Sequence, residues 1–173
     1  MSRNIEIKAR IVSADAWCAK IAALAGAGPI DIAQDDTFFR CDRARLKLRA
    51  FSEGTGELIY YRRADEYGPK ESFYLRSPTL SPDSLRECLT LAYGQVGRVR
   101  KHRRLFLVGR TRVHLDEVEN LGDFLELEVV LADDEPAEAG VREARELMEK
   151  MDIEPQQLIN EAYVDLLARR DVD

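Results

Sequence analysis

Cysteine and histidine are scarce in this chain, and neither occurs in a pattern that holds zinc. The 173 residues contain three cysteines and two histidines, with no Cys-x-x-Cys pair. His102 and His114 lie on different predicted strands, so a zinc site is not expected. An odd cysteine count in a chain of this size does not suggest a disulfide framework. We therefore expect Cys18, Cys41 and Cys88 to be buried thiols.

Other signatures are missing as well. The sequence has no glycine-rich phosphate loop of the Walker type and no G-x-G-x-x-G fingerprint, so any phosphate must be held by side chains. The net charge of −6 argues against a general nucleic-acid binder, because such proteins usually have a basic excess. No apolar run approaches the ~18 residues of a membrane span, and the N-terminus has no apolar leader. We expect a cytoplasmic protein without a nucleic-acid or membrane partner.

Charged residues are more frequent in this sequence than in an average protein. Asp, Glu, Lys and Arg make up 34% of the residues, compared with about a quarter in an average protein. Much of this charge alternates with apolar residues at the period of a β-strand. In residues 3–10, for example, Asn4, Glu6, Lys8 and Arg10 share one face, while isoleucine and alanine take the other. The same alternation returns in residues 45–50, 112–116 and 125–129.

The order of the predicted elements indicates one α+β domain over residues 1–173. The predicted strands are 3–10, 34–41, 44–51, 57–64, 71–77, 96–108, 111–118 and 124–131, with a loop at 65–70. Helices are predicted after Ser13, after Ser81, from Pro136 and from Pro155. Regular turn signals between the strands favour a largely antiparallel sheet that is closed, or nearly closed, into a barrel. Its apolar face would pack on helices and its charged face would line a channel.

The charged strand positions form a basic set and a smaller acidic set. The basic set is Lys8, Arg10, Arg45, Lys47, Arg49, Arg63, Lys70, Lys101, Arg103 and Arg112, and the acidic set is Glu6, Asp116, Glu126 and Glu128. Any one such face could equally be solvated or form ordinary cross-strand ion pairs. Together, however, so many cations in one cavity would repel each other unless an anion lay among them. A polyphosphate suits both Arg and Lys, and carboxylates one strand-step apart suit Mg²⁺ or Mn²⁺.

With these residues assembled, the chain resembles the CYTH superfamily, also called triphosphate tunnel metalloenzymes. Within it, the chain resembles the branch of class IV adenylyl cyclases and thiamine triphosphatase-like proteins. The matching blocks are residues 4–8, 37–39, 45–49, 61–63, 68–70 with Ser72, 99–103, 111–116, 121–128 and 163–167. The match runs from residue 3 to about 168, in order and at similar spacing. It implies an eight-stranded antiparallel β-barrel that forms a triphosphate tunnel, with flanking helices and C-terminal helices.

The resemblance also implies roles for both charged sets. The substrate's phosphates would be bound by Lys8, Arg45, Lys47, Arg49, Arg63, Lys70, Lys101, Arg103 and Arg112. A Mg²⁺ or Mn²⁺ cofactor would be bound by Glu6, Asp116, Glu126 and Glu128. Lys8 is also the candidate catalytic residue, which would orient or activate the nucleophile, because it lies beside Glu6 on the same face.

One position departs from the family pattern. The first acid of the family's Glu-x-Glu-x-Lys signature is Asn4 in this chain. Asparagine offers a carbonyl oxygen but no charge, so we expect one metal position to be weaker.

Three functions remain open from the sequence. The favoured one is a divalent-metal-dependent triphosphatase that acts on an inorganic or organic triphosphate. The alternatives are an adenylyl cyclase, which converts ATP to cyclic AMP and pyrophosphate, and a non-catalytic binder of phosphorylated ligands. In each case we expect a small-molecule triphosphate partner and a monomer or homodimer.

Overall fold

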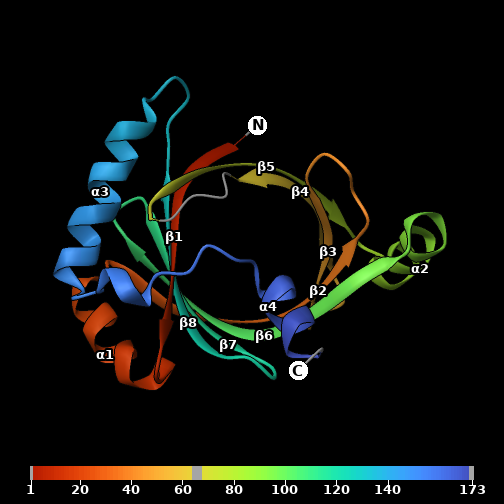
Figure 1. Ribbon diagram of the computed structural model, residues 1–173, viewed down its shortest axis with the longest axis horizontal. Coiled ribbons are helices and arrows are strands. Elements are labelled where there is room, and N and C mark those ends of the chain that lie inside the picture. The colour runs from red at the N-terminus through yellow and green to blue at the C-terminus, as the bar shows by residue number, and fades with distance from the viewer. Residues whose placement is uncertain (1, 64–67, 172–173) are drawn as a thin grey trace.

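The computed structural model describes residues 2–63 and 68–171, and its strands close into a barrel (Figure 1). The strands are β1 (Ser2–Ile11), β2 (Ala27–Phe39), β3 (Arg45–Phe51), β4 (Gly56–Arg63), β5 (Lys70–Thr79), β6 (Gln95–Val108), β7 (Thr111–Val118) and β8 (Gly122–Val130). The helices are α1 (Ala14–Leu24), α2 (Pro82–Tyr93), α3 (Ala137–Lys150) and α4 (Tyr163–Arg170), with a 3₁₀ turn at Pro155–Gln157. Residues 65–67 of the loop predicted at 65–70 lie outside the described residues, and Lys70 already belongs to β5.

Each strand pairs antiparallel with its neighbours in the order β1-β5-β4-β3-β2-β6-β7-β8, and β8 pairs with β1 to close the barrel. The predicted eight-stranded antiparallel barrel is therefore confirmed. Closure leaves no free sheet edge, so every strand is held on both sides. It also fixes which side chains meet inside, because successive residues of a strand point to opposite faces.

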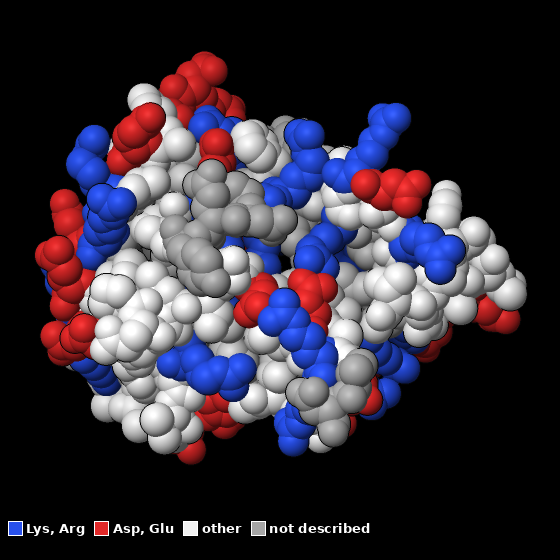
Figure 2. Space-filling view, in the orientation of Figure 1, with Lys and Arg blue, Asp and Glu red and all other residues white. Residues whose placement is uncertain are grey.

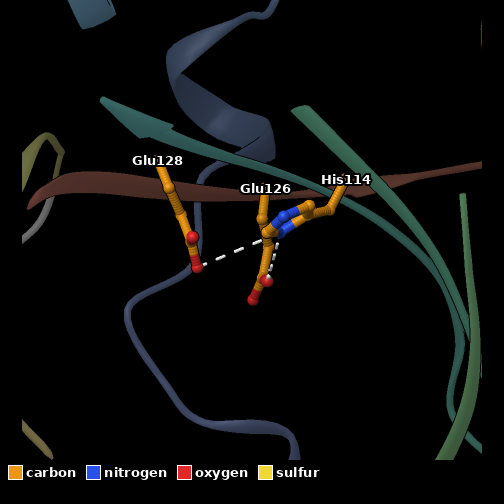
Figure 3. A group of neighbouring side chains, drawn as sticks. All are labelled: His114, Glu126 and Glu128. Carbon is orange, nitrogen blue, oxygen red and sulfur yellow. Dashed lines mark ion pairs between the residues drawn. The ribbon is translucent and has the colours of Figure 1, made fainter. Parts of the chain in front are cut away.

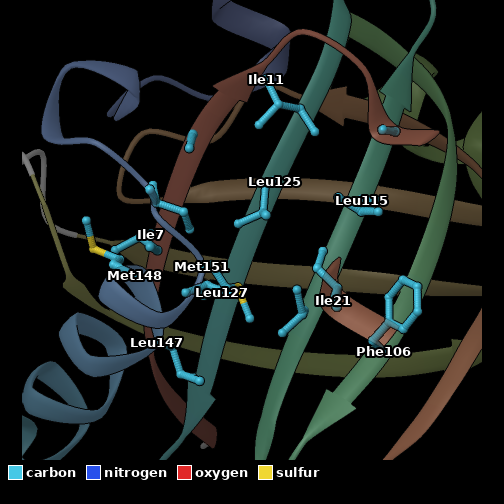
Figure 4. Close-up of a cluster of buried hydrophobic side chains, with 14 residues drawn as sticks. Ile7, Ile11, Ile21, Phe106, Leu115, Leu125, Leu127, Leu147, Met148 and Met151 are labelled. Atoms are coloured by element: carbon cyan, nitrogen blue, oxygen red, sulfur yellow. The ribbon is translucent and has the colours of Figure 1, made fainter. Parts of the chain in front are cut away.

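The main hydrophobic core lies outside the barrel, between its wall and two helices (Figure 4). Outward residues of β1, β7 and β8, among them Ile7, Leu115 and Leu127, pack with Ile21 of α1 and with Met151, which directly follows α3. All five are nearly or completely buried. Burying a side chain of this size contributes about 1.5–3 kcal/mol. The outward apolar residues of the strands therefore stabilise the fold. The inward positions are left free to carry charged side chains.

The C-terminal segment differs from the helix predicted to run from Pro155. After the 3₁₀ turn the chain is extended, and the Ile159 N–H donates to the Lys8 carbonyl at 2.9 Å. Because the segment makes this backbone bond to β1, it is not helical, and α4 begins only at Tyr163. α4 then lies at one mouth of the barrel (Figure 1), where the Tyr163 ring packs 4.8 Å from that of Phe124.

Two further predictions are corrected by the structure. β2 begins at Ala27 and not at residue 34, because its first half pairs with β6 as far as Leu107. The cysteines are not buried: Cys18 and Cys41 are half-buried and Cys88 is exposed, and all three are free thiols. Separately, none of the described helices is long and apolar enough to cross a membrane.

Candidate functional site

The barrel encloses a cavity of about 280 Å³ with a strongly charged wall. Among the described residues, eight cationic side chains line it, against five carboxylates, which leaves an excess of three positive charges within that set. The cations are Lys8, Lys47, Arg49, Arg63, Arg76, Lys101, Arg103 and Arg112, and the carboxylates are Glu6, Asp36, Glu57, Glu126 and Glu128. In space-filling view, blue and red side chains border a hollow near the centre of one face (Figure 2). The charged faces of separate strands thus converge, as the alternation predicts.

One side of the wall carries a group that could hold a metal ion (Figure 3). It consists of His114 from β7 and Glu126 and Glu128 from β8, with ligand atoms that all lie within 4.8 Å of one another. His114 and Glu126 are direct cross-strand partners, and Glu128 is the next inward residue of β8. Among the described residues, His114 Nδ1 is buried without a hydrogen-bond partner, 3.6 Å from Glu126 Oε2 and 3.9 Å from Glu128 Oε1. We call this group the acid–histidine cluster.

The two carboxylates of this cluster are held in their charged form by neighbouring cations. Burial alone would raise the pKa of Glu126, but Lys8, whose Nζ lies 3.0 Å from Oε1, contributes most to holding that pKa well below its usual value. Glu6 lies opposite Glu128 across the β1–β8 pair. Burial, followed by the charge of Glu128, raises the pKa of Glu6. A divalent ion beside these carboxylates would relieve this repulsion.

The donor atoms fit the expected metals. Carboxylate oxygens suit both Mg²⁺ and Mn²⁺, while an imidazole nitrogen suits the transition metal better. Asn4 adds a further oxygen: its side chain is 2% exposed and lines the cavity, and its Oδ1 accepts no hydrogen bond from the described residues. The signature asparagine thus points an unpaired acceptor into the charged cavity.

A second charged group lies on the wall formed by β2 and β3. Asp36 is 1% exposed and accepts hydrogen bonds from Lys47 Nζ at 2.7 Å and from Arg49 Nε and Nη2 at 2.8 Å each. These cations hold the pKa of Asp36 well below its usual value, against the effect of burial. Burial, and then the charge of Arg49, lowers the pKa of Lys47 to about 7. Two predicted phosphate ligands are therefore already paired with a carboxylate.

Asp116 does not line the cavity and is not one of the three residues of the acid–histidine cluster, but Arg103 Nη2 joins it to that cluster, at 2.6 Å from Asp116 Oδ2 and 2.7 Å from Glu126 Oε2. It is fully buried, and its two oxygens accept hydrogen bonds from Arg103 at 2.6 Å each and from the Tyr163 hydroxyl at 2.9 Å. Lys101 Nζ is 3.5 Å away. Its predicted role as a metal ligand stays a prediction, and in this structure Asp116 anchors Arg103 and α4.

The C-terminal segment contacts several predicted phosphate ligands at the mouth beside α4. Arg63 Nη2 donates to the Asn160 carbonyl at 2.8 Å, and Lys70 Nζ donates to the same oxygen at 3.1 Å. Lys8 Nζ reaches the Glu161 carbonyl at 3.4 Å. The backbone carbonyls of this segment therefore already accept hydrogen bonds from three of the predicted phosphate ligands.

Three residues of the predicted basic set do not line the cavity. Arg45 makes a two-bonded pair with Asp165 of α4, at 3.1 and 2.5 Å. Lys70 is buried on β5 as the cross-strand partner of Glu6, and its Nζ donates to the Asn160 carbonyl at the mouth of the barrel. Arg10 is exposed, and its guanidinium lies 4.8 Å from the centre of the Phe124 ring.

Sequence reasoning missed Asp36 and His114. The alternation places His114 on the same charged face as Arg112 and Asp116, but no metal-binding role was predicted for it from the sequence. Asp36 offered a weaker signal, because it follows Asp35, and only the register with Arg49 shows which of the two points inward.

Comparison with known proteins agrees with this geometry. The CYTH domain model matches residues 2–163. The chain belongs to the CYTH family. No protein with a curated description matches the chain.

Solved structures share the CYTH fold at low sequence identity. The PH1012 protein of Pyrococcus horikoshii is 23% identical, with a TM-score of 0.84 over 94% of this chain and 98% of that one. A candidate adenylate cyclase from Vibrio parahaemolyticus is 20% identical, with a TM-score of 0.76 over 95% and 97% of the two chains. HpAC1 from Hippeastrum, a candidate adenylyl cyclase with a dominant triphosphatase activity, is 14% identical, with a TM-score of 0.67 over 100% and 97%. At these identities the likeness shows the fold alone.

Proposed function

We propose that this CYTH protein is a divalent-metal-dependent triphosphatase that acts on an inorganic or organic triphosphate held inside the barrel. The observation that carries the proposal is the cavity wall, which combines an excess of three positive charges with a cluster of one histidine and two glutamates. An enclosed cationic cavity attracts a polyanion. The triphosphatase activity named for a structural relative is consistent with this function.

The cations would bind and orient the phosphate chain. Arg49 and Lys47 reach the cavity from β3, Arg103 and Lys101 from β6, and Arg112 from β7. Arginine holds phosphate oxygens with two parallel N–H bonds, whereas lysine acts as a compact charge. Because these side chains come from three separate strands, they can hold successive phosphates of one chain.

The acid–histidine cluster and Glu6 would hold Mg²⁺ or Mn²⁺ against the phosphates. Such an ion neutralises charge that develops on the phosphate oxygens as the phosphoryl group is transferred. The protein's own part is to fix the ligands, which β7 and β8 do by presenting them on adjacent strands of a closed sheet. Arg112 supports the cluster from the side, with Nη2 2.9 Å from Glu128 Oε2.

Lys8 is the candidate for orienting the nucleophile. Its ammonium lies 3.0 Å from Glu126 Oε1 and 3.8 Å from the centre of the Tyr163 ring, so it is fixed beside the acid–histidine cluster. A water molecule placed there would meet a positioned donor next to the metal ligands. Lys47, with its pKa lowered to about 7, is able to hold or release a proton at Nζ near neutral pH.

The test is product analysis with the purified chain. Inorganic triphosphate and the four common nucleoside triphosphates are each incubated with Mg²⁺, Mn²⁺ or a chelator. Orthophosphate, pyrophosphate and cyclic nucleotide are then measured. We expect metal-dependent release of orthophosphate or pyrophosphate without cyclic nucleotide.

A pair of variants links this activity to the cavity. Glu128→Gln keeps the side-chain shape but removes one charge of the cluster, and should reduce turnover at least tenfold, as expected for disturbance of a metal site. Glu117→Gln makes the same change in the same strand pair, on a partly exposed side chain that bonds His102, and should leave turnover unchanged. Cyclic AMP with pyrophosphate would identify a cyclase, and saturable binding without products would identify a binder. Absence of any triphosphate binding would overturn the proposal.

A further inference from the structure

A tyrosine from outside the barrel strands reaches the charged cavity. Tyr163 is the first residue of α4, is 5% exposed and lines the cavity. Its ring packs on that of Phe124 from β8, with 4.8 Å between the ring centres. The strands carry the charges of the cavity, whereas Tyr163 belongs to a helix that follows the last strand in the chain.

α4 is held on the barrel by contacts that do not involve Tyr163. Asp165 makes a two-bonded pair with Arg45 of β3, at 3.1 and 2.5 Å. Val164 packs against β6 at Gly97, where an added Cβ would lie 2.4 Å from Val164 Cγ2. The missing side chain of Gly97 therefore leaves the room that the helix needs. Contacts with two different strands thus fix where the Tyr163 side chain enters the cavity.

The Tyr163 hydroxyl bonds a carboxylate that holds an arginine. It donates to Asp116 Oδ2 at 2.9 Å, and Arg103 donates to both oxygens of Asp116 at 2.6 Å each. Burial, followed by the charge of Asp116, raises the pKa of Tyr163 well above its usual value. The hydroxyl therefore keeps its proton and remains a donor to Asp116.

The Tyr163 ring lies beside two ammonium groups of the cavity. Lys8 Nζ is 3.8 Å and Lys101 Nζ 4.9 Å from the centre of the ring. Both lysines are buried and both line the cavity. An aromatic ring attracts a cation over its face, and the attraction is stronger where water is excluded. The ring therefore helps to fix the candidate nucleophile-orienting lysine and one predicted phosphate ligand.

We propose that Tyr163 is a positioning residue for the cations that bind and act on the triphosphate. Its hydroxyl orients Arg103 through Asp116. Because Arg103 uses Nε and Nη2 for carboxylates, this orientation decides where Nη1 meets a phosphate. Its ring orients the ammonium groups of Lys8 and Lys101. This inference rests on the proposed triphosphatase function and adds a residue that acts on the substrate only through these cations.

Two variants separate the hydroxyl from the ring. Tyr163→Phe removes only the hydroxyl, so that cations alone hold Asp116 and the Arg103 guanidinium is drawn toward the carboxylate, away from a phosphate. The dissociation constant of inorganic triphosphate, measured by calorimetry with a chelator present, should rise about fivefold. The kcat with Mn²⁺ should stay within about twofold of native, because the ring still holds Lys8.

Tyr163→Leu removes the ring as well as the hydroxyl. The Lys8 ammonium then loses the aromatic face beside it, and kcat should fall about tenfold, in addition to the weaker binding. Phenylalanine at this position should thus restore most of the turnover that leucine loses. A merely structural role of Tyr163 would not divide the two effects between binding and turnover in this way.

Val164→Ala is the control for loosening of α4. Val164 is the next residue of the helix, is buried to a similar extent and does not line the cavity. Its truncation should lower the melting temperature at least as much as Tyr163→Phe does, because it removes packing against β6. The dissociation constant and kcat, both measured well below the melting transitions of all variants, should stay within about twofold of native.

The outcomes separate this inference from the proposed function. Native affinity in Tyr163→Phe or native kcat in Tyr163→Leu would overturn the positioning role, as would equal losses in all three variants. If the native chain binds triphosphate without turnover, the triphosphatase fails and the affinities decide. A loss in Tyr163→Phe that is larger in Tyr163→Leu and absent in Val164→Ala would then support the positioning role, and any other order would overturn it. Failure of triphosphate to bind would overturn both.

Discussion

Replacing Asp36 with asparagine should destabilise the fold by about 3–5 kcal/mol, as for the loss of one partner from a buried ion pair. Asp36 is 1% exposed and accepts three hydrogen bonds of 2.7–2.8 Å from Lys47 and Arg49. The variant leaves both cations facing a neutral amide. Lys47 can escape part of the penalty by losing its proton, since its pKa is already lowered to about 7. Arg49 stays charged and keeps its share of the penalty. Because Lys47 avoids part of it, we expect a destabilisation in the lower half of this range.

The assay is unfolding by urea and by heat, monitored by circular dichroism. For a domain of this length, about 3 kcal/mol corresponds to a melting temperature lower by roughly 10 °C. Asp35→Asn is the matched control. Asp35 is the neighbouring residue and also makes a two-bonded pair, with Arg98 at 2.7 and 2.6 Å, but both side chains are partly exposed. Its replacement should cost less than about 1 kcal/mol.

The same variant reports on phosphate binding. If Lys47 and Arg49 are phosphate ligands, inorganic triphosphate should stabilise Asp36→Asn more than the native chain, because the anion replaces the missing carboxylate. A ligand at 100 times its dissociation constant stabilises by about 2.7 kcal/mol. Equal stability of the native chain and Asp36→Asn would refute the reasoning about the buried pair. A destabilised variant with no greater response to triphosphate would refute the assignment of these cations to phosphate.

Three further predictions concern the metal site, the packing and the pH dependence. Asn4→Glu should tighten Mn²⁺ binding about tenfold, or ~1.4 kcal/mol, in calorimetry with inorganic triphosphate present; unchanged affinity would show that position 4 is not a ligand position. Gly140→Ala should destabilise the fold by about 1–3 kcal/mol in urea, because a Cβ there would lie 2.6 Å from Ile5 Cγ1 and 2.7 Å from Leu131 Cδ2; native-like stability would contradict this packing. Since the pKa of Asp36 is lowered in the fold, its stabilisation is fully present above its unfolded value of about 3.9 and is lost as pH falls through the folded value. The stability gap between the native chain and Asp36→Asn should therefore not narrow between pH 7 and about 4 and should shrink below, and a gap that closes already at pH 6 would contradict the lowered pKa.

Local sequence determined the two-faced character of the strands. A period of two puts Glu6 and Lys8 on one face and Ile5 and Ile7 on the other, whatever the strand pairs with. The apolar faces must be covered, and α1 and α3 supply the cover. The resemblance to the CYTH family added the closure of the barrel, because the alternation and turn signals alone left a closed and a nearly closed sheet both open.

Tertiary structure alone decided which charges meet. Asp35 and Asp36 are adjacent and identical in kind, yet register with β3 turns Asp36 onto Arg49 inside the barrel, and Asp35 bonds Arg98 on β6. The same applies to Asp116, which lies in the same alternation as His114 but is bonded by Arg103, with no place in the acid–histidine cluster. Such pairings depend on strand register and on barrel closure between segments distant in the chain. Neither strand register nor barrel closure can be read from the hydrophobic period or the composition. A one-residue shift of register moves every side chain to the opposite face without changing the sequence.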